Sequence, residues 1–458
     1  PPVIVGIGAS AGGVEALRSF FAATPSECGL AFVVYLHFPP HGTSHLVDIL
    51  AQRTTVPVMA AVHGAAIQPD HIYVVPPGML ATLGGGSINL SDLDHIRKPI
   101  DTLFCSLASE YGEHAIGVVL SGTGSDGTRG IEAINAKGGL TVAQGDGGSD
   151  SHPEMPANAI ATGLVDHVLR VEEIPAHLMA YGRSLSSGGA PHPAKITNHR
   201  LKSVKDDLCE LLQNAARHDF SRYKASTFLR RVGRRMRVLK ISDWNAYVDL
   251  ARRKPEEVML LFRDLLIGVT AFFRDEEAFE ALSSRIIPRL FEGKGAQDKV
   301  RVWVPGCSSG EEAYSIAILL CEHAHTLAFP PQVQVFATDI DEEALRIARS
   351  GRYPASALEE MREDRIRRFF ARDGDMFVAS KELRTMCTFA VHSIIRDPPL
   401  CAIDFISCRN VLIYFDRHLQ DQVIPTFHFA LRPGGMLFLG PSENIGHHTN
   451  LFNSVDNI

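Results

Sequence analysis

The sequence predicts an α/β protein with more than one domain. Strand-length apolar runs alternate with helical patterns in two separate stretches of the chain, and such alternation is typical of parallel sheets covered by helices on both faces. The length of 458 residues gives an expectation of about three domains at roughly 150 residues each. We expect a doubly wound parallel sheet first, then a small helical domain, then a Rossmann-like sheet with a small β-subdomain.

Composition excludes several classes of protein. The formal net charge of -7 argues against a general nucleic-acid binder. The eight cysteines contain no C-x-x-C pair and no zinc-type His/Cys cluster, which predicts a cytoplasmic protein without a metal site. The sequence lacks a run of about 18 apolar residues, so we expect no membrane insertion. It opens on Pro1-Pro2 directly before a strand pattern, which suggests a fragment of a longer protein without a signal peptide.

The elements and boundaries follow from these patterns. The first sheet is expected to contain strands at 3–7, 31–36, 72–75 and 116–120. A Gly-, Ser- and Pro-rich stretch predicts a linker at 182–197, which ends the first domain at residue 181. Helical patterns fill 198–289. The last domain, 290–458, is expected to contain strands at 300–304, 333–338, 404–407 and 436–439.

The first predicted strand runs into a glycine-rich turn that carries a serine. Residues 6–13, GIGASAGG, fit G-x-S-x-G around Ser10, the tight strand-to-helix turn that exposes a nucleophilic serine. The same residues approximate the dinucleotide motif G-x-G-x-x-G/A. A glycine-rich turn that only lets a helix pack on its strand is a third interpretation.

A histidine and an aspartate further along the chain favour the interpretation of Ser10 as a nucleophile. His37 follows the second predicted strand, and Asp126 follows the strand at 116–120. The carboxyl ends of parallel strands share one edge, so these side chains are expected to meet Ser10 there. An imidazole can take the serine proton, a carboxylate can orient the imidazole, and N–H groups at the next helix can receive an oxyanion. His41 and His45, spaced i, i+4, have no third ligand nearby, and we expect solvated or capping roles for them.

Four strings over about residues 1–180 resemble the catalytic domain of the chemotaxis protein-glutamate methylesterase: GIGASAGG, LHFPPHGTSHL, VVLSGTGSDGTRGIEAINAKGGLTVAQ and PEMPANAIATGLVDHVL. The resemblance implies that Ser10 is the nucleophile, His37 the base and Asp126 its orienter, with Ala11 and Thr123 on the oxyanion side. It implies hydrolysis of glutamyl methyl esters on receptors, and also deamidation of receptor glutamines. Thr123 stands where the family usually has Met. The family's phospho-receiver domain is not part of this sequence, so regulation by its phosphorylation is not expected.

A second turn of small residues follows the strand at 300–304. Its sequence at 305–312, PGCSSGEE, lets a ligand approach the backbone. Glu311 and Glu312 would repel a phosphate there and attract a cation, which favours the amino or sulfonium end of S-adenosylmethionine over a dinucleotide. Alternatively, these acids only stabilise the helix dipole. Asp339 follows the next strand, where an acid is placed to bind ribose hydroxyls.

Residues 200–458 resemble the chemotaxis receptor methyltransferase family through the strings FFRD, GCSSGEEAYS, ATDID and CRNVLIYF. The resemblance implies methyl transfer from S-adenosylmethionine, with S-adenosylhomocysteine as product, to glutamates of a methyl-accepting receptor. The implied cofactor contacts are Thr270, Arg274, Glu311, Asp339, Asn410 and Val411. Gly268 stands where the family usually has Asn, so one cofactor hydrogen bond is expected to be missing.

A basic helical pattern predicts a docking surface. Four apolar residues recur at spacings of three and four as a buried stripe, namely Leu229, Val232, Met236 and Leu239. In this net-acidic chain the flanking arginines are expected to bind an acidic partner such as a glutamate-rich receptor coiled coil, with RNA as the alternative. The expected docking residues are Arg230, Arg231, Arg234 and Arg235. The small β-subdomain is expected at 373–389.

Two other functions stay open at this point, as does the oligomeric state. A dinucleotide-dependent oxidoreductase using both glycine turns would be stabilised by NAD and indifferent to S-adenosylmethionine. A signalling scaffold with degenerate sites would bind partners without transferring methyl groups or releasing esters.

Overall fold

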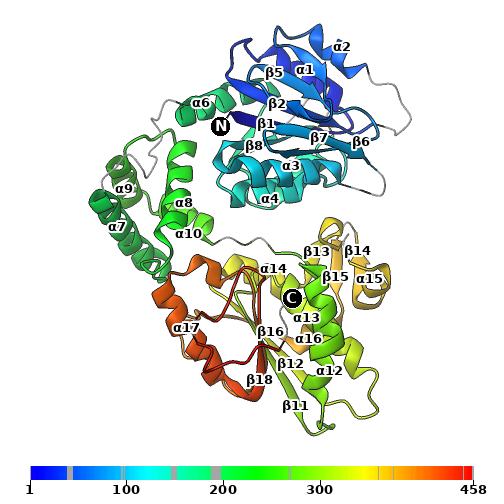
Figure 1. Ribbon diagram of the computed structural model, residues 1–458, viewed down its shortest axis with the longest axis vertical. Helices are drawn as coiled ribbons and strands as arrows, with labels where there is room; N and C mark the ends of the chain where they lie inside the picture. The colour runs from blue at the N-terminus through cyan, green and yellow to red at the C-terminus, as the bar shows by residue number, and fades with distance from the viewer. Residues whose placement is uncertain are drawn as a thin grey trace. The chain divides into compact units, whose positions relative to one another are not determined.

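The computed structural model of the protein divides into two compact units, which are described separately (Figure 1). The first unit comprises residues 1–216 and 228–261, and the second comprises 217–227 and 262–458. The structure describes residues 2–38, 45–93, 96, 98–145, 152–186, 198–266, 268, 270–358, 361–374, 376–446 and 448–455. Of the predicted linker, residues 187–197 lie outside this described part, and residues 182–186 continue helix α6 (Ile174–Ser186).

The first unit contains a seven-stranded parallel sheet in the order β10-β9-β8-β1-β2-β5-β3. The four predicted strands are present as β1 (Val3–Ala9), β2 (Leu30–Leu36), β5 (His71–Val74) and β8 (Ala115–Val119). The other three are β3 (Val58–Ala60), β9 (Leu140–Gln144) and β10 (His167–Leu169). A separate small antiparallel sheet contains β4 (Ala65–Ala66), β6 (Met79–Gly84) and β7 (Ser87–Asp92).

Alternate residues of the buried strands serve two cores, one on each face of this sheet. On one face Val5 and Ile7 pack with helices α1 (Gly13–Ala22), α2 (Leu46–Ala51) and α6. On the other face Ile4 and Val33 pack with α3 (Pro99–Tyr111), α4 (Thr128–Ala136) and α5 (Glu154–Ala161). The sheet is therefore covered on both faces, as a doubly wound fold requires.

The two glycines of β1 are explained by helix packing. A Cβ added at Gly6 would lie 2.8 Å from Phe104 Cε1, and one added at Gly8 would lie 2.4 Å from Ile100 Cγ2. Both glycines lie inside the strand, and α3 packs directly on them. The packing interpretation therefore holds for Gly6 and Gly8, and neither belongs to a phosphate-binding turn.

Helices fill most of the middle of the chain. They are α7 (Asn198–Ala216), α8 (Ala225–Val238), α9 (Trp244–Arg253), α10 (Pro255–Leu265), α11 (Glu276–Ala281) and α12 (Ile287–Phe291). Most of α8 and all of α9 belong to the first compact unit, with the seven-stranded sheet. None of the described helices combines the length and the apolar character that a membrane-spanning segment needs.

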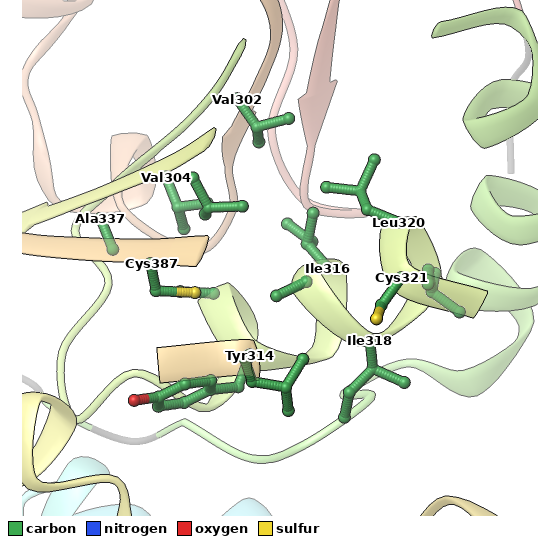
Figure 2. Packing of buried hydrophobic residues seen from close by; sticks show 14 of the residues in the cluster. Val302, Val304, Tyr314, Ile316, Ile318, Leu320, Cys321, Ala337 and Cys387 are labelled. Carbon is green, nitrogen blue, oxygen red and sulfur yellow. The ribbon is translucent and has the colours of Figure 1, made fainter. Parts of the chain in front are cut away.

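The second unit contains a five-stranded parallel sheet in the order β16-β12-β11-β17-β18. Its strands are β11 (Lys299–Pro305), β12 (Gln332–Asp339), β16 (Cys387–Val391), β17 (Ile403–Cys408) and β18 (Leu431–Leu439). Its remaining helices are α13 (Glu311–Ala324), α14 (Glu342–Ser350), α15 (Glu363–Phe369), α16 (Lys381–Met386) and α17 (Arg417–Ala430). Figure 2 shows the core on one face, where Val302 and Val304 of β11 lie near Ile316 of α13. On the other face Trp303 packs with residues of α17.

The small β-subdomain is an antiparallel sheet of three strands whose position differs from the prediction. It contains β13 (Arg352–Pro354), β14 (Phe370–Asp373) and β15 (Met376–Ala379). The last part of the predicted segment forms β16 instead, which pairs with β12 at the edge of the five-stranded sheet. The apolar alternation of 387–391 suited either sheet, and tertiary packing decided between them.

Candidate active sites

Three loops meet at Ser10, which follows the carboxyl end of β1. The Ser10 N–H donates to Ser121 O at 3.0 Å, and the His37 N–H donates to Ala9 O at 3.1 Å. A Cβ added at Gly122 would lie 2.8 Å from Ser10 Cβ. The ends of β1, β2 and β8 therefore converge, as expected from strand ends that share one edge of the sheet.

His37 and Asp126 are in direct contact. The His37 Nε2 atom lies 2.9 Å from Asp126 Oδ2. Asp126 is buried and also accepts the N–H groups of Ile100, Asp101 and Gly127 at 2.8–3.0 Å. These bonds fix the carboxylate, and the carboxylate fixes the imidazole. Since Nε2 faces Asp126, Nδ1 is the ring nitrogen left to take a serine proton. Among the described residues no hydrogen bond joins Ser10 Oγ to His37, and apo sites often lack this contact.

Sequence reasoning missed Asp101, a second buried acid beside Asp126. Burial and the nearby charge of Asp126 raise the pKa of Asp101 to about 7. Its Oδ1 accepts the Gly130 N–H at 2.8 Å, and Lys98 Nζ lies 3.9 Å from its Oδ2. A protonated Asp101 adds no second negative charge to the cluster. No motif in the sequence marks this residue, because only the fold brings α3 against the strand end.

Of the two expected oxyanion residues, Ala11 directly follows Ser10, and Thr123 follows Gly122, which packs against Ser10. Ala11 is half-buried, and its carbonyl accepts Ser121 Oγ at 2.9 Å, whereas Thr123 is exposed. Neither residue's backbone N–H donates to another described residue, so both amides can serve an oxyanion. Of the rival histidines, His41 lies outside the described residues. His45 is exposed, with Nδ1 3.8 Å from Asp48 Oδ2.

In the second unit β11 leads into a turn that needs left-handed backbone conformations. Gly306, Ser308 and Gly310 have φ angles of 70°, 48° and 96°. A Cβ added at Gly306 would lie 2.5 Å from Val411 Cγ2, so a side chain there would clash. The Gly306 N–H donates to Thr338 O at 2.7 Å, which ties the turn to the end of β12.

Asp339 holds this turn together from the end of β12. Its Oδ2 accepts the Ser308 N–H at 2.7 Å, and its Oδ1 accepts the N–H groups of Ile340 and Asp341 at 2.7 and 3.0 Å. Burial raises the pKa of Asp339, and the hydrogen bonds from the backbone oppose that shift. A carboxylate offers about four acceptor sites, so one remains for the ribose hydroxyl that the sequence predicts.

The two glutamates at the start of α13 are buried carboxyls. Burial raises the pKa of Glu311 to about 7, although Ser309 Oγ donates to its Oε2 at 2.7 Å. Burial also raises the pKa of Glu312, and the charges of Arg409 and Arg274 oppose that shift. A nearby cation stabilises the ionised form of a buried carboxyl group whose pKa is raised, so such a group favours a positively charged ligand. The residues present therefore fit the positively charged end of S-adenosylmethionine.

Replacing Glu311 with glutamine should stabilise the second unit at pH 8 by up to about 3 kcal/mol. The folded carboxyl, with a pKa of about 7 against an ordinary 4.5, keeps a proton that the unfolded chain has released. Ionisation of Glu311 therefore lowers the stability of the folded state as the pH rises from about 4.5 to about 7, and a glutamine removes this loss of stability. Scanning calorimetry of the intact chain at pH 5 and pH 8 measures the difference. The exposed Glu363→Gln change serves as control, and an equal gain at both pH values would contradict the assignment.

The loop before α11 carries two more of the predicted cofactor contacts. Thr270 and Arg274 are both half-buried. Gly268, where relatives usually have Asn, accepts a hydrogen bond from Ser308 Oγ at 3.3 Å through its carbonyl. Arg409 was missed: it is buried, and its Nη2 lies 2.5 Å from Asp275 Oδ2. It links the loop at 270–275 to the end of β17.

Glu443, also missed by sequence reasoning, organises the loop that carries Asn410 and Val411. Its Oε2 accepts the N–H groups of Asn410 and Gly440, both at 2.8 Å. Its Oε1 accepts those of Val411 and Leu412 at 2.8 and 2.7 Å. Four backbone donors therefore depend on one carboxylate, which holds Asn410 in a left-handed conformation with φ 59°.

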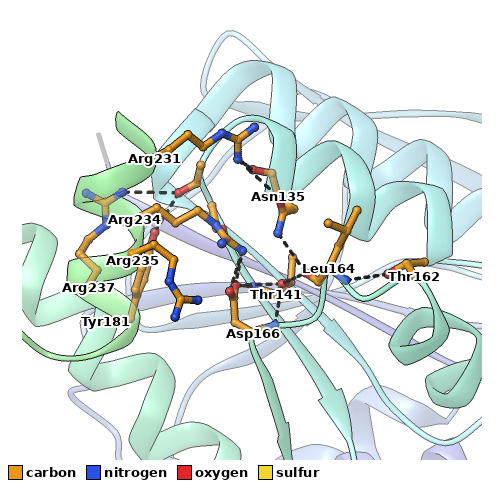
Figure 3. Close-up of polar contacts among 12 residues, drawn as sticks. Asn135, Thr141, Thr162, Leu164, Asp166, Tyr181, Arg231, Arg234, Arg235 and Arg237 are labelled. Carbon is orange, nitrogen blue, oxygen red and sulfur yellow. Dashed lines mark hydrogen bonds and ion pairs between the residues drawn. The ribbon is translucent and has the colours of Figure 1, made fainter. Parts of the chain in front are cut away.

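The structure corrects the predicted docking face. Arg231, Arg234 and Arg235 are buried, and only Arg230 of the four is exposed. Figure 3 shows the cluster: Arg231 donates to Asn135 O at 2.6 Å, and Arg234 Nη2 donates to both oxygens of Asp166 at 2.6 and 2.7 Å. Arg235 pairs with Glu257 at 2.7–2.9 Å. These three arginines hold structure inside the first unit, so they do not present a face to a partner.

Changing Arg234 to lysine should lower the free energy of unfolding of the first unit by about 2 kcal/mol. The guanidinium bonds both oxygens of buried Asp166 through Nη2 and also donates from Nε to Gly139 O at 3.3 Å, and a lysine has only one nitrogen for these two partners. Denaturant unfolding measures the loss. The exposed Arg230→Lys change on the same helix should have almost no effect. An equal loss in both variants would show that the contacts of Arg234 with Asp166 and Gly139 are not the cause.

The fold and its sites define a protein with a Ser-His-Asp constellation on one parallel sheet and a site for S-adenosylmethionine on another. Family models agree with both parts. CheB methylesterase matches residues 5–178, the CheR methyltransferase all-alpha domain matches 206–266, and the CheR methyltransferase SAM binding domain matches 268–457. The chain belongs to the chemotaxis protein methyltransferase family and carries a CheB methylesterase domain ahead of it. The predicted family, fold class and cofactor are thereby confirmed.

Relatives cover the two parts to different extents. Chemotaxis protein methyltransferase 2 of Pseudomonas aeruginosa is 35% identical over 238 residues, which are 51% of this chain and 83% of that protein. A 104.1 kDa protein of Rhodobacter capsulatus is 34% identical over 422 residues, which are 87% of this chain. The chain spans only 44% of that relative's length. The Thermotoga maritima CheB methylesterase catalytic domain covers 39% of this chain and 98% of its own, at 28% identity and a TM-score of 0.37.

Proposed function

We propose that this chain removes and installs methyl esters on glutamates of methyl-accepting chemotaxis receptors in the cytoplasm. The observation that carries the proposal is that one chain matches both the methylesterase and the methyltransferase families, with the His37–Asp126 pair beside the Ser10 turn. All eight cysteines are free thiols, which fits a reducing compartment.

In the esterase reaction Ser10 Oγ attacks the ester carbonyl while His37 takes its proton. Asp126 keeps the imidazole oriented and stabilises its charged form. The N–H groups of Ala11 and Thr123 receive the oxyanion. The intermediate collapses and expels methanol, which leaves with the proton from His37. Water then attacks the acyl-serine by the same route and releases the glutamate. A glutamine side chain would lose ammonia by the same steps.

For the transferase reaction, S-adenosylmethionine supplies an electrophilic methyl group when bound. Glu311 would face its cationic end and Asp339 its ribose hydroxyls. The accepting glutamate is already ionised near neutral pH, so no general base is needed. The work of the site is to align the carboxylate with the methyl group and to exclude water. The turn at Gly306 and the loop at Val411, which touch each other, would form one wall.

The test supplies the intact chain with methyl-labelled S-adenosylmethionine and a receptor cytoplasmic fragment. It measures protein-bound label and released methanol. We expect Asp339→Ala to block label uptake while methanol release from a premethylated fragment continues, and the exposed Asp364→Ala to change neither. Unchanged uptake in Asp339→Ala would show that Asp339 does not hold the cofactor, and no uptake by the wild type would remove the transferase assignment. Thermal stabilisation by NAD but not by S-adenosylmethionine would support the oxidoreductase alternative.

We also propose that the two activities alternate or act on different glutamates. Acting together on one glutamate, they would consume S-adenosylmethionine without net change. Methyl uptake and methanol release measured simultaneously on the intact chain test this. Equal and constant rates at the same glutamates would refute it.

A further inference from the structure

The first unit contains a pocket that the Ser10 site does not use. Its walls come from the first residues of β9 and β10, from α6, and from the end of α8 with residues 240–242. Its volume is about 220 Å³. The strands of this sheet are parallel, and Ser10 follows the carboxyl end of β1. Because Leu140 and His167 begin their strands, the pocket lies at the opposite edge of the sheet.

The lining of this pocket is cationic. Arg183, Arg237 and Lys240 line it together with His167 and His177, and the described lining contains no Asp or Glu. The two imidazole rings lie 5.5 Å apart. The charges of Arg183, Arg237 and Lys240 share this lining, and a bound anion would offset them.

The acids near the pocket are already engaged by buried arginines. Asp166 is held by both of its oxygens to Arg234, and Glu113 lies 3.2 Å from Arg237 Nη1. Burial lowers the pKa of His167, and the charges of His177, Lys240 and Arg234 lower it further, while Asp166 alone opposes them. Arg183, Arg237, Lys240 and Arg234, which lie at or beside the pocket, outnumber these two acids.

Arg237 has an unused donor in this wall. Its side chain is more than nine-tenths buried, yet its Nε has no hydrogen-bond partner in the described structure. The guanidinium also lies over the Tyr181 ring, 5.9 Å from its centroid, which restricts its orientation. This donor has almost no accessible surface, so Arg237 would contribute its charge to ligand binding.

Lys240 is held at the pocket by an unusual backbone conformation. It lies two residues beyond the end of α8 with φ 57°, and the next N–H, from Ile241, donates to Met236 O at 2.8 Å. A left-handed conformation is unfavourable for a lysine compared with a glycine. The same wall carries apolar side chains from Leu140, Val238 and Ile241.

We propose that this pocket binds a small organic phosphate. A phosphate ester carries close to two negative charges and several acceptor oxygens, which suit a guanidinium, an ammonium and two imidazoles together. The apolar wall suits the organic part, whereas inorganic phosphate would leave it unused. Because both α6 and the end of α8 line the pocket, a bound ligand also holds α8 against the seven-stranded sheet.

Calorimetric titration of the intact chain with uridine 5′-monophosphate tests this. The uracil base avoids competition at a site that recognises adenosine. We expect saturable binding, tighter than that of inorganic phosphate, and no binding of uridine at matched ionic strength. Lys240→Asn removes the charge and keeps a residue that tolerates a left-handed conformation, and it should weaken binding at least about 10-fold. His177→Ala should also weaken it, and the exposed Lys254→Asn should not.

Each result decides the proposal. Thermal midpoints without ligand show that the variants fold, so a loss of binding in Lys240→Asn or His177→Ala reports on the pocket. Equal affinity in the wild type and both pocket variants would overturn the assignment. So would equal heat from potassium chloride titrated at the ionic strength of the ligand, or uridine binding as tightly as its monophosphate. If inorganic phosphate bound as tightly as the nucleotide, the proposal that the ligand carries an organic group would be overturned.

Discussion

Replacing Ser10 with alanine should abolish methanol release from a methylated receptor, lowering kcat on the order of 10⁴- to 10⁶-fold. The hydroxyl is the only group at the end of β1 that can form the acyl intermediate, and His37 and Asp126 can only assist it. The backbone around residue 10 is held by main-chain contacts to Ser121 and Gly13, so the fold should not change. Methanol release from a premethylated receptor fragment measures the loss.

The transferase part provides an internal control in the same variant. Label uptake from S-adenosylmethionine should persist in Ser10→Ala, and the label should now accumulate, because nothing removes it. Ser19→Ala, on the helix that follows, should release methanol at the wild-type rate. Methanol release that continues in Ser10→Ala would mean that water is activated without a nucleophilic serine, and the acyl-serine route would be wrong.

The sequence predicted the parts of the sites that depend on strand ends. Apolar runs located β1, β2 and β8, and parallel strands place their following residues at one edge, so His37 and Asp126 could be paired before any coordinates. Asp101 could not be found this way. Its effect comes from burial against Asp126 at the start of α3, and burial of a single acid leaves no periodic signal in the sequence.

Helix α8, which carries the buried arginines, shows what the periodicity of apolar residues cannot predict. The stripe correctly predicted buried Leu229, Val232 and Met236, but Leu239 is 37% exposed. Flanking charges normally indicate a solvated face. Here the arginines are buried, because acceptors from distant parts of the chain bind them. Asp166, for example, accepts hydrogen bonds from Arg234 with both of its oxygens. A buried charge is tolerated only when such a partner is present, and the sequence does not reveal which acid will provide it.

Replacing Glu443 with alanine should lower kcat/KM for methyl transfer on the order of 10³-fold, or about 4 kcal/mol. The carboxylate accepts four backbone N–H groups, and hydrogen bonds to a charged group contribute roughly 1.5–3 kcal/mol each. Without it, Asn410 has no reason to keep its left-handed conformation. Val411 would then leave its contact with the turn at Gly306, although neither residue has been changed.

This residue acts by positioning, so its test separates binding from folding. The Kd of S-adenosylmethionine should rise along with the fall in methyl transfer, while methanol release by the other part stays at the wild-type rate. Glu443→Gln keeps the size and one acceptor oxygen but turns an amide donor toward N–H groups, so it should restore little of the loss. Glu363→Gln, exposed on α15, is the matched control. A Glu443→Ala variant that binds S-adenosylmethionine with wild-type affinity would show that the loop keeps its shape unaided, and that the carboxylate stabilises the fold without forming the site.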